Sequence, residues 1–261
     1  MKDVKIAICA ILKDEHQYLD EWIKHHLSIG IDYIYLYEDN NSKPHNEICD
    51  KYDNVFLMLM RDFIDISKLW RKKQVHVYNN FIEKYKHEID YVFFIDIDEF
   101  VMFEEGYDMS SLINICNERG SVLLPWKFYG ANGLIDNPHM NIVDTYIKEC
   151  EMELPKHRHE MYIQSKTFAK IDEGCMENMH RYKHSELIIP YDSGDIYHIC
   201  WINHYITKSW EEWCYRIFIR GQITDLVRTL NEFFLYNPDM LPLKDELLKK
   251  PYCLDKPFIN F

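Results

Sequence analysis

The chain has 261 residues, of which 47% are hydrophobic and 15% aromatic, so it carries enough apolar surface for a large folded core. Its formal net charge of −13 argues against a protein that binds nucleic acid through phosphate contacts, because no long basic stripe offsets the acidic residues. The apolar run after Lys5 is only about eight residues long, too short to cross a bilayer, and the cysteines form no C-x-x-C pair. We therefore expect a cytoplasmic protein with reduced thiols and no transmembrane segment, for which peripheral contact with a membrane stays open.

Strand and helix patterns alternate through the first hundred residues. Apolar runs at 6–12, 33–37, 55–60 and 91–95 predict buried strands. Between the first two runs we expect a helix, with Asp14 as its N-cap and Gly30 as its stop. A second helical pattern covers 74–88. This alternation predicts an α/β protein with a mainly parallel sheet flanked by helices.

The pattern is looser in the rest of the chain. It predicts a helix at 110–119, a strand at 121–126, and a loop-rich region to about 199 that includes a strand at 165–170. Ser209 and Glu212 have the spacing of a capping box and predict a helix start. Further helices are expected at 223–234 and 244–249.

Three carboxylates follow the strand at 91–95 within four positions, namely Asp96, Asp98 and Glu99. Ligands of open α/β sheets bind beyond the carboxyl ends of the strands, and paired carboxylates there suit Mg²⁺ or Mn²⁺ with open positions for phosphate oxygens. An exposed turn would produce the same D-x-D spacing by chance, but it would not need the buried run before it. The sequence therefore predicts a site for a metal and a diphosphate.

Several segments together resemble the family 2-like and family 92 glycosyltransferases. The matching segments are 10–15, 18–22, His25-His26, 30–32, 35–37, 40–42, 94–100, Trp126, 128–130, Gly133, Lys166-Thr167, His180, 203–205, 207–209 and Arg220-Gly221, in the order of the family. Departures are Asp14, where the family often has Asn, and Tyr129-Gly130-Ala131 in place of its Phe-Gly-Ser pattern. They leave the donor and the acceptor position open.

The resemblance implies a GT-A fold in one glycosyltransferase domain over 1–261. Residues 1–103 would bind nucleotide-sugar and metal, 104–221 would form the acceptor side, and 222–261 would be a helical tail. The expected reaction is metal-dependent transfer from a nucleotide-diphosphate sugar, a UDP-sugar, to a glycan or lipid-linked glycan acceptor, with inversion. Mn²⁺ or Mg²⁺ would be held by Asp96, Asp98 and His204.

The donor would contact residues at the strand ends and two lysines, namely Lys13, Glu15, Asp39, Asn40, Lys166 and Lys208. Each of the strand-end residues also has an interpretation as a turn or capping residue, and His204 has one as a core histidine. An inverting transfer needs a base for the acceptor hydroxyl. Spacing along the chain does not show which of Asp172, Glu173, Glu177 and His180 is this base. We take Glu173 and His180 as the catalytic candidates.

Other functions stay open at this point. A nucleotidyltransferase uses a similar sheet and metal pair, although the glycine- and lysine-rich phosphate loop that usually follows its first strand is missing. A glycan-binding relative without activity would keep the aromatic residues from Trp126 to Gly133, which are suited to stacking on a sugar, but would lose the acids. A zinc hydrolase built on His180 and His184 lacks the glutamate of H-E-x-x-H.

Overall fold

The computed structural model describes residues 4–39, 44–62, 73–150, 165–172, 174–178, 180–182, 199–221 and 228–249, with Arg119 and Arg181 described by their backbone alone. None of the helices in these segments is both long and apolar enough to cross a bilayer.

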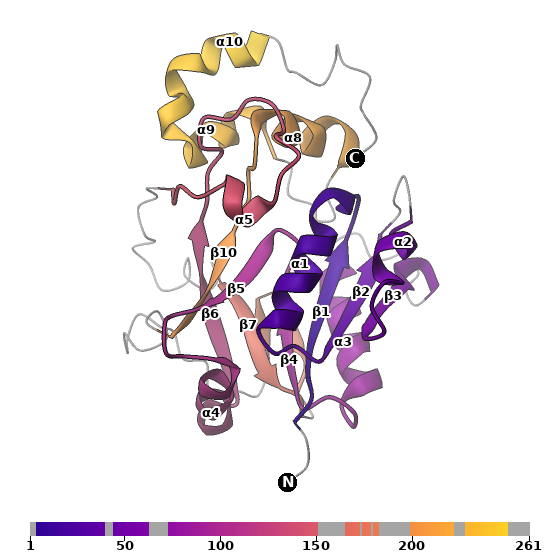
Figure 1. Ribbon diagram of the computed structural model, residues 1–261. Helices are drawn as coiled ribbons and strands as arrows, with labels where there is room; N and C mark the ends of the chain where they lie inside the picture. Colours follow the sequence, from indigo (N-terminus) through magenta and orange to yellow (C-terminus); the bar gives the residue numbers. More distant parts are fainter. Residues whose placement is uncertain are drawn as a thin grey trace.

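An eight-stranded sheet in the order β3-β2-β1-β4-β7-β6-β10-β5 runs through the molecule (Figure 1). The neighbours β3, β2, β1 and β4 are parallel, as are β6 and β10, whereas β7 is antiparallel to β4 and β6, and β5 is antiparallel to β10. A separate two-stranded sheet pairs β8 with β9. The strands are β1 Ile6–Leu12, β2 Tyr33–Glu38, β3 Val55–Leu59, β4 Tyr91–Phe94, β5 Glu99–Phe103, β6 Ser121–Phe128, β7 Ser165–Lys170, β8 Met176–Asn178, β9 Arg181–Tyr182 and β10 Cys200–His204.

Helices cover both faces of the parallel part of the sheet. The α-helices are α1 His16–Ser28, α2 Asn46–Cys49, α3 Lys73–Tyr85, α4 Met109–Arg119, α5 Ile142–Thr145, α8 Trp210–Tyr215, α9 Phe233–Tyr236 and α10 Lys244–Lys249. One π-helical segment, Arg216–Arg220, continues α8, and 3-10 turns lie at Met60–Asp62, Leu230–Glu232 and Pro238–Leu243.

The alternation of side chains along β1 explains the two-sided packing. Ile8 and Ala10 pack with the stripe of α1 on one face of the sheet, and Cys9 and Ile11 pack with α3 on the other. A third apolar cluster joins α8 to the last described segment through Trp210, Trp213, Phe233, Phe234 and Met240, at the top of Figure 1. The predicted α/β class, with a mostly parallel sheet flanked by helices, is confirmed.

The local predictions are confirmed in part. The stripe of α1 is buried as expected, and the capping box of Ser209 and Glu212 is present. The N-cap prediction was wrong, because Asp14 has a left-handed backbone, with φ of 49°, and α1 begins after Glu15. The side chain of Glu15 makes no capping hydrogen bond.

Other boundaries also differ. Strands β5 and β10 were not predicted, and α3 ends at Tyr85 rather than at 88. Within 228–236 the expected continuous helix is a 3-10 turn followed by the short α9.

Candidate functional site

The acidic residues form a tight turn between β4 and β5. The amide of Asp96 donates to Oε2 of Glu99 at 2.9 Å, and the amide of Glu99 donates to the carbonyl of Asp96 at 3.2 Å. β4 runs parallel to β1, with Phe94 opposite Cys9, so the turn lies at the same sheet edge as the residues that follow β1. The predicted strand that delivers acids to an edge is therefore present.

Asp98 faces His204 across this edge. β10 pairs with β5 in a register that sets His204 opposite Glu99, and Nε2 of His204 lies 3.8 Å from Oδ1 of Asp98. Burial acts to raise the pKa of Asp98, but His204, with the charges of Arg216 and Lys208, holds that pKa well below its usual range. Burial lowers the pKa of His204, so a neutral imidazole faces a carboxylate at neutral pH.

Asp96 has different partners. Lys166, on β7, places Nζ 2.7 Å from Oδ2 of Asp96 and 3.7 Å from Oε2 of Glu99, and Gln74 donates to Oδ1 of Asp96 at 2.9 Å. The Lys166 side chain is 1% exposed. Burial acts to lower its pKa, but the nearby Asp96 and Glu99 carboxylates raise it, so the ammonium stays charged. The negative charge of Asp96 thus compensates the positive charge of the buried Lys166.

Two of the three predicted metal ligands have a geometry that fits a divalent cation. Ligand atoms on one ion with bonds of about 2.1 Å lie about 3 to 4.2 Å apart, and the 3.8 Å between Asp98 and His204 falls in that range. Each oxygen of Asp96 already accepts a hydrogen bond, Oδ1 from Gln74 and Oδ2 from Lys166. Among the described residues no group of three or more His, Cys, Asp or Glu side chains could hold an ion. Asp98 and His204 are thus the two predicted ligands whose spacing fits one shared ion, and ligation by Asp96 stays a prediction.

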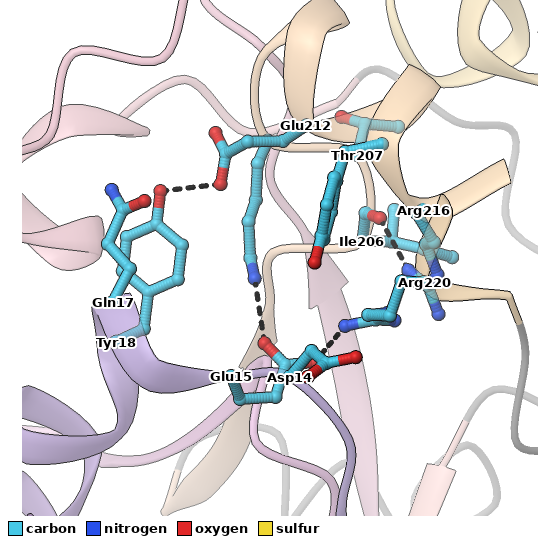
Figure 2. Close-up of a pocket in the computed structure, with 11 residues that line it drawn as sticks. Asp14, Glu15, Gln17, Tyr18, Ile206, Thr207, Glu212, Arg216 and Arg220 are labelled. Atoms are coloured by element: carbon cyan, nitrogen blue, oxygen red, sulfur yellow. Dashed lines mark hydrogen bonds and ion pairs between the residues drawn. The ribbon is translucent and has the colours of Figure 1, made fainter. Parts of the chain in front are cut away.

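A pocket opens next to Asp98, between the start of α1 and the segment from β10 to the π-helix (Figure 2). Three basic side chains line it, Lys208, Arg216 and Arg220. Arg216 donates to the carbonyl of Ile206 at 2.9 Å and lies 3.5 Å from Oδ2 of Asp98. The pocket therefore places three cations next to the Asp98 and His204 pair, together with the carboxylates of Asp14, Glu15 and Glu212, which also line it.

Glu15 closes this pocket from the α1 side. Its carboxylate accepts from Lys208 at 3.4 Å and from Arg220, and Figure 2 shows it directed into the cavity. The Lys208 ammonium also lies 4.3 Å above the ring of Tyr18. Lys208 has a left-handed backbone with φ of 55°, as Asp14 does, and such conformations of non-glycine residues are concentrated at functional sites.

Lys13 and Asp39 lie at the same sheet edge. Nζ of Lys13 is 3.7 Å from the position that a Cβ on Gly221 would take, so the lysine lies against the end of the π-helix. Asp39 follows β2 and is buried, with Oδ2 3.5 Å from Nζ of Lys73, and Oδ1 has no hydrogen-bond partner among the described residues. Asn40 lies outside the described residues.

Of the catalytic candidates, His180 lies near the acids. Its Nδ1 donates to the carbonyl of Ser165 at 2.7 Å, which leaves Nε2 as the acceptor. Burial, together with the charge of Lys166, lowers its pKa to about 4. The Trp126 ring packs against both imidazoles, with its centroid 5.6 Å from that of His180 and 4.5 Å from that of His204. Glu173 lies outside the described residues, and the carboxylate of Asp172 accepts from Tyr182 and the amide of Gly174.

Arg216 and Arg220 are basic pocket residues for which the sequence predicted no role, although Arg220 lies in a segment that resembles the family. They are four residues apart on a helical segment, a spacing that puts both on one face, and this was the available signal. Trp210, Trp213 and Cys214 just before them are buried, a pattern typical of a helix that packs on the core. The π-helical turn that carries them is rare and often occurs at functional sites.

Comparison with known proteins gives a family match over most of the chain. The model of Glycosyltransferase family 92 matches residues 2–217. A Glycosyltransferase family 92 protein of Ricinus communis is 25% identical over 248 residues, covering 92% of this chain and 42% of that protein. A family 92 protein of Oryza sativa subsp. japonica is 21% identical over 209 residues, covering 79% of this chain and 34% of that protein. The chain thus spans less than half the length of the curated relatives it matches.

Among solved structures, a crystal structure of a mycobacterial protein is similar with a TM-score of 0.43 and 10% identity, over 77% of this chain and 65% of that one.

Proposed function

The chain belongs to glycosyltransferase family 92, and from this premise we propose that it transfers a sugar from a nucleotide-diphosphate donor, a UDP-sugar, to a hydroxyl of a glycan or lipid-linked glycan acceptor, with inversion. A cytoplasmic location, with peripheral membrane contact where the acceptor is lipid-linked, belongs to the same proposal.

One observation supports this proposal above the others. The cationic pocket of Lys208, Arg216 and Arg220 opens beside Asp98 and His204, at the carboxyl ends of β1 and β4. A diphosphate leaves with growing negative charge, and fixed cations in a partly closed cavity stabilise that charge more than water does. Three guanidinium and ammonium groups next to a possible metal pair suit a diphosphate leaving group.

The metal ligands and three of the remaining donor candidates have roles in this proposal. Asp98 and His204 would hold Mn²⁺ or Mg²⁺, which when bound would supply positive charge against the diphosphate. Asp39, buried with an unpaired oxygen among the described residues, would accept hydrogen bonds from the nucleoside, and Lys13 would contact the phosphates. Lys166 would act mainly through Asp96, because its ammonium is engaged there.

His180 is the proposed base for the acceptor hydroxyl. The carbonyl of Ser165 fixes the proton on Nδ1, so Nε2 presents a lone pair. Its low pKa keeps that nitrogen unprotonated over the physiological range. Glu173 stays an alternative base. The Trp126 ring next to His180 would form part of the acceptor side, in the 104–221 half of the single domain.

A donor-hydrolysis screen tests the proposal. Purified protein with Mn²⁺ and a panel of nucleotide sugars should release the nucleoside diphosphate from one of them. Arg216→Gln should slow the release at least about tenfold, because it removes one donor to the leaving group. Arg228→Gln is the matched control, since Arg228 pairs with Glu232 at 3.5 Å and does not line the pocket.

The same screen separates the competing functions. Release of inorganic pyrophosphate from a nucleoside triphosphate and a sugar phosphate would indicate a nucleotidyltransferase. Binding of glycans without turnover of any donor would indicate a glycan-binding relative.

A further inference from the structure

Every basic side chain of the pocket already has a carboxylate partner. Lys208 and Arg220 both contact Glu15, and Arg216 contacts Asp98. The side chains of Glu15, Lys208 and Arg220 are each 11% exposed, so water screens these pairs weakly. An anion that enters the pocket therefore meets the negative charge of Glu15 between the two cations it would bind.

Glu15 is held in this position through its backbone. Its amide donates to Nε2 of His45 at 3.2 Å, and Nδ1 of His45 donates to Glu38 at 2.6 Å. The ring of His16 stacks on His45 with 3.8 Å between centroids. The carbonyl of Glu15 accepts from the first turn of α1, including the amide of Leu19 at 3.1 Å. With both backbone groups bonded, the main chain of Glu15 is fixed at the wall of the pocket.

The carboxylate of Glu212, which also lines the pocket, differs from that of Glu15 in its partners. Glu212 accepts from Tyr18 and Tyr146, each at 2.6 Å, and completes the capping box of Ser209, so its charge is spread over neutral donors. Glu15 instead bridges two of the lining cations, Lys208 and Arg220.

We propose that Glu15 determines ligand specificity in this pocket, by disfavouring bare polyanions such as free phosphate or pyrophosphate relative to a diphosphate complexed with a divalent cation. The inference rests on the proposed function. A metal-complexed diphosphate carries less net negative charge, so it repels Glu15 less, while its oxygens still reach Lys208, Arg216 and Arg220. Two like charges about 5 Å apart at an effective dielectric constant of 20 to 40 repel enough to change an affinity at least about tenfold.

Calorimetric titration with inorganic pyrophosphate tests the role of Glu15. Wild type, Glu15→Gln and the control Glu83→Gln are each titrated with excess EDTA and again with Mg²⁺. Glu83 is a 79% exposed carboxylate that pairs with Lys86 far from the pocket. We expect Glu15→Gln to bind metal-free pyrophosphate at least about tenfold more tightly than wild type, and Glu83→Gln to match wild type.

Two further comparisons keep the test decisive. Glu15→Asp keeps the charge and should behave like wild type rather than like Glu15→Gln. Wild type alone should prefer the magnesium complex at least about tenfold over the free anion, a measurement that needs no variant. Equal or weaker binding of the free anion by Glu15→Gln, or equal binding of both forms by wild type, would overturn the inference.

Failure of the proposed function would look different. A protein that releases no nucleoside diphosphate from any donor, yet shows these pyrophosphate affinities, would keep the role of Glu15 and lose the transfer reaction.

Discussion

Replacing Asp98 by Asn separates the roles of the two aspartates in the acidic turn. The Asp98 side chain is 9% exposed and charged, with Oδ1 3.8 Å from His204 and Oδ2 3.5 Å from Arg216. Asparagine keeps the shape and removes the charge. If Asp98 holds the cation together with His204, this one change removes the only anionic ligand of the pair.

These contacts allow an estimate of the losses in metal affinity and in the free energy of unfolding. Removing a partner that merely supports a ligand costs about 10 to 100-fold in metal affinity, so loss of a direct anionic ligand should cost more than about 100-fold, or about 2.7 kcal/mol. Arg216 keeps its hydrogen bond to the carbonyl of Ile206. The fold should therefore lose only about 1 to 2 kcal/mol, which lowers the melting temperature of a domain of this size by about 2 to 8 °C.

Asp96→Asn should show the opposite ranking. It removes the closest partner of Lys166, whose side chain is 1% exposed. Breaking a buried pair costs about 3 to 5 kcal/mol, which we reduce to about 2 to 3 because Asp96 is itself 35% exposed. The larger loss of stability should come with the smaller loss of metal affinity.

Titration of Mn²⁺ in the presence of UDP, combined with scanning calorimetry of the metal-free proteins, measures both quantities for both variants. Undiminished Mn²⁺ binding by Asp98→Asn would remove Asp98 from the metal site. A stronger loss of binding in Asp96→Asn than in Asp98→Asn would refute the division of roles between the two acids.

Three other variants have defined outcomes. His204→Gln should weaken Mn²⁺ binding at least about tenfold while the melting temperature falls by less than about 4 °C, and the reverse pattern would favour a core histidine. His180→Asn should lower transfer by about 100-fold or more. In wild type, kcat/KM should stay constant as the pH is lowered and should decrease only near pH 4, because the pKa of His180 is lowered to about 4 and the imidazole is neutral above that pH. A decrease near the ordinary histidine pKa would contradict this assignment. Asn237→Ala should cost about 2 to 3 kcal/mol by thermal unfolding, because the buried amide accepts from Ala131 and donates to Thr207, and a change below about 1 kcal/mol would show that this bridge is weak.

The parallel half of the fold could be predicted because its signals are local. The alternation of apolar runs with a 3.6-residue stripe in α1 is visible within a window of a few turns, and the buried residues of α1 follow it. The acids after β4 were found for the same reason, since an apolar run and its carboxylates are adjacent in the chain. These features depend little on distant residues.

The missed features depend on pairing between distant segments. β10 is defined by its neighbours β5 and β6, and its position brings His204 next to Asp98, more than a hundred residues earlier. The partnership of Lys166 with Asp96 likewise follows from the insertion of β7 beside β4. Spacing along the chain contains neither relation. Spacing therefore indicated which residues have suitable chemistry, whereas the pairing of Asp98 with His204 was expected only from the family resemblance.

The wrong N-cap has a physical reason connected with the pocket. A carboxylate just before a helix usually accepts hydrogen bonds from the free amides of the first turn, and Asp14 was expected to do this. Instead the chain turns through a left-handed Asp14, and the carboxylate of Glu15 is directed toward Lys208 and Arg220. The amide of Glu15 is satisfied by His45. The start of α1 therefore lacks a side-chain capping hydrogen bond, and the Glu15 carboxylate lies in the pocket instead.

Both ends of the described chain contribute to this pocket. Glu15 follows β1, whereas Arg220 lies just beyond the segment that matches the family model, which ends at 217. Asn237, further on, joins Thr207 in the pocket wall to the turn at Ala131. Since Glu15 and Arg220 are joined by an ion pair across about two hundred positions, the cationic cavity exists only when the whole fold is formed. The residues after 217 therefore belong to the architecture of the site, and a domain defined by the family match alone would lack one of its three cations.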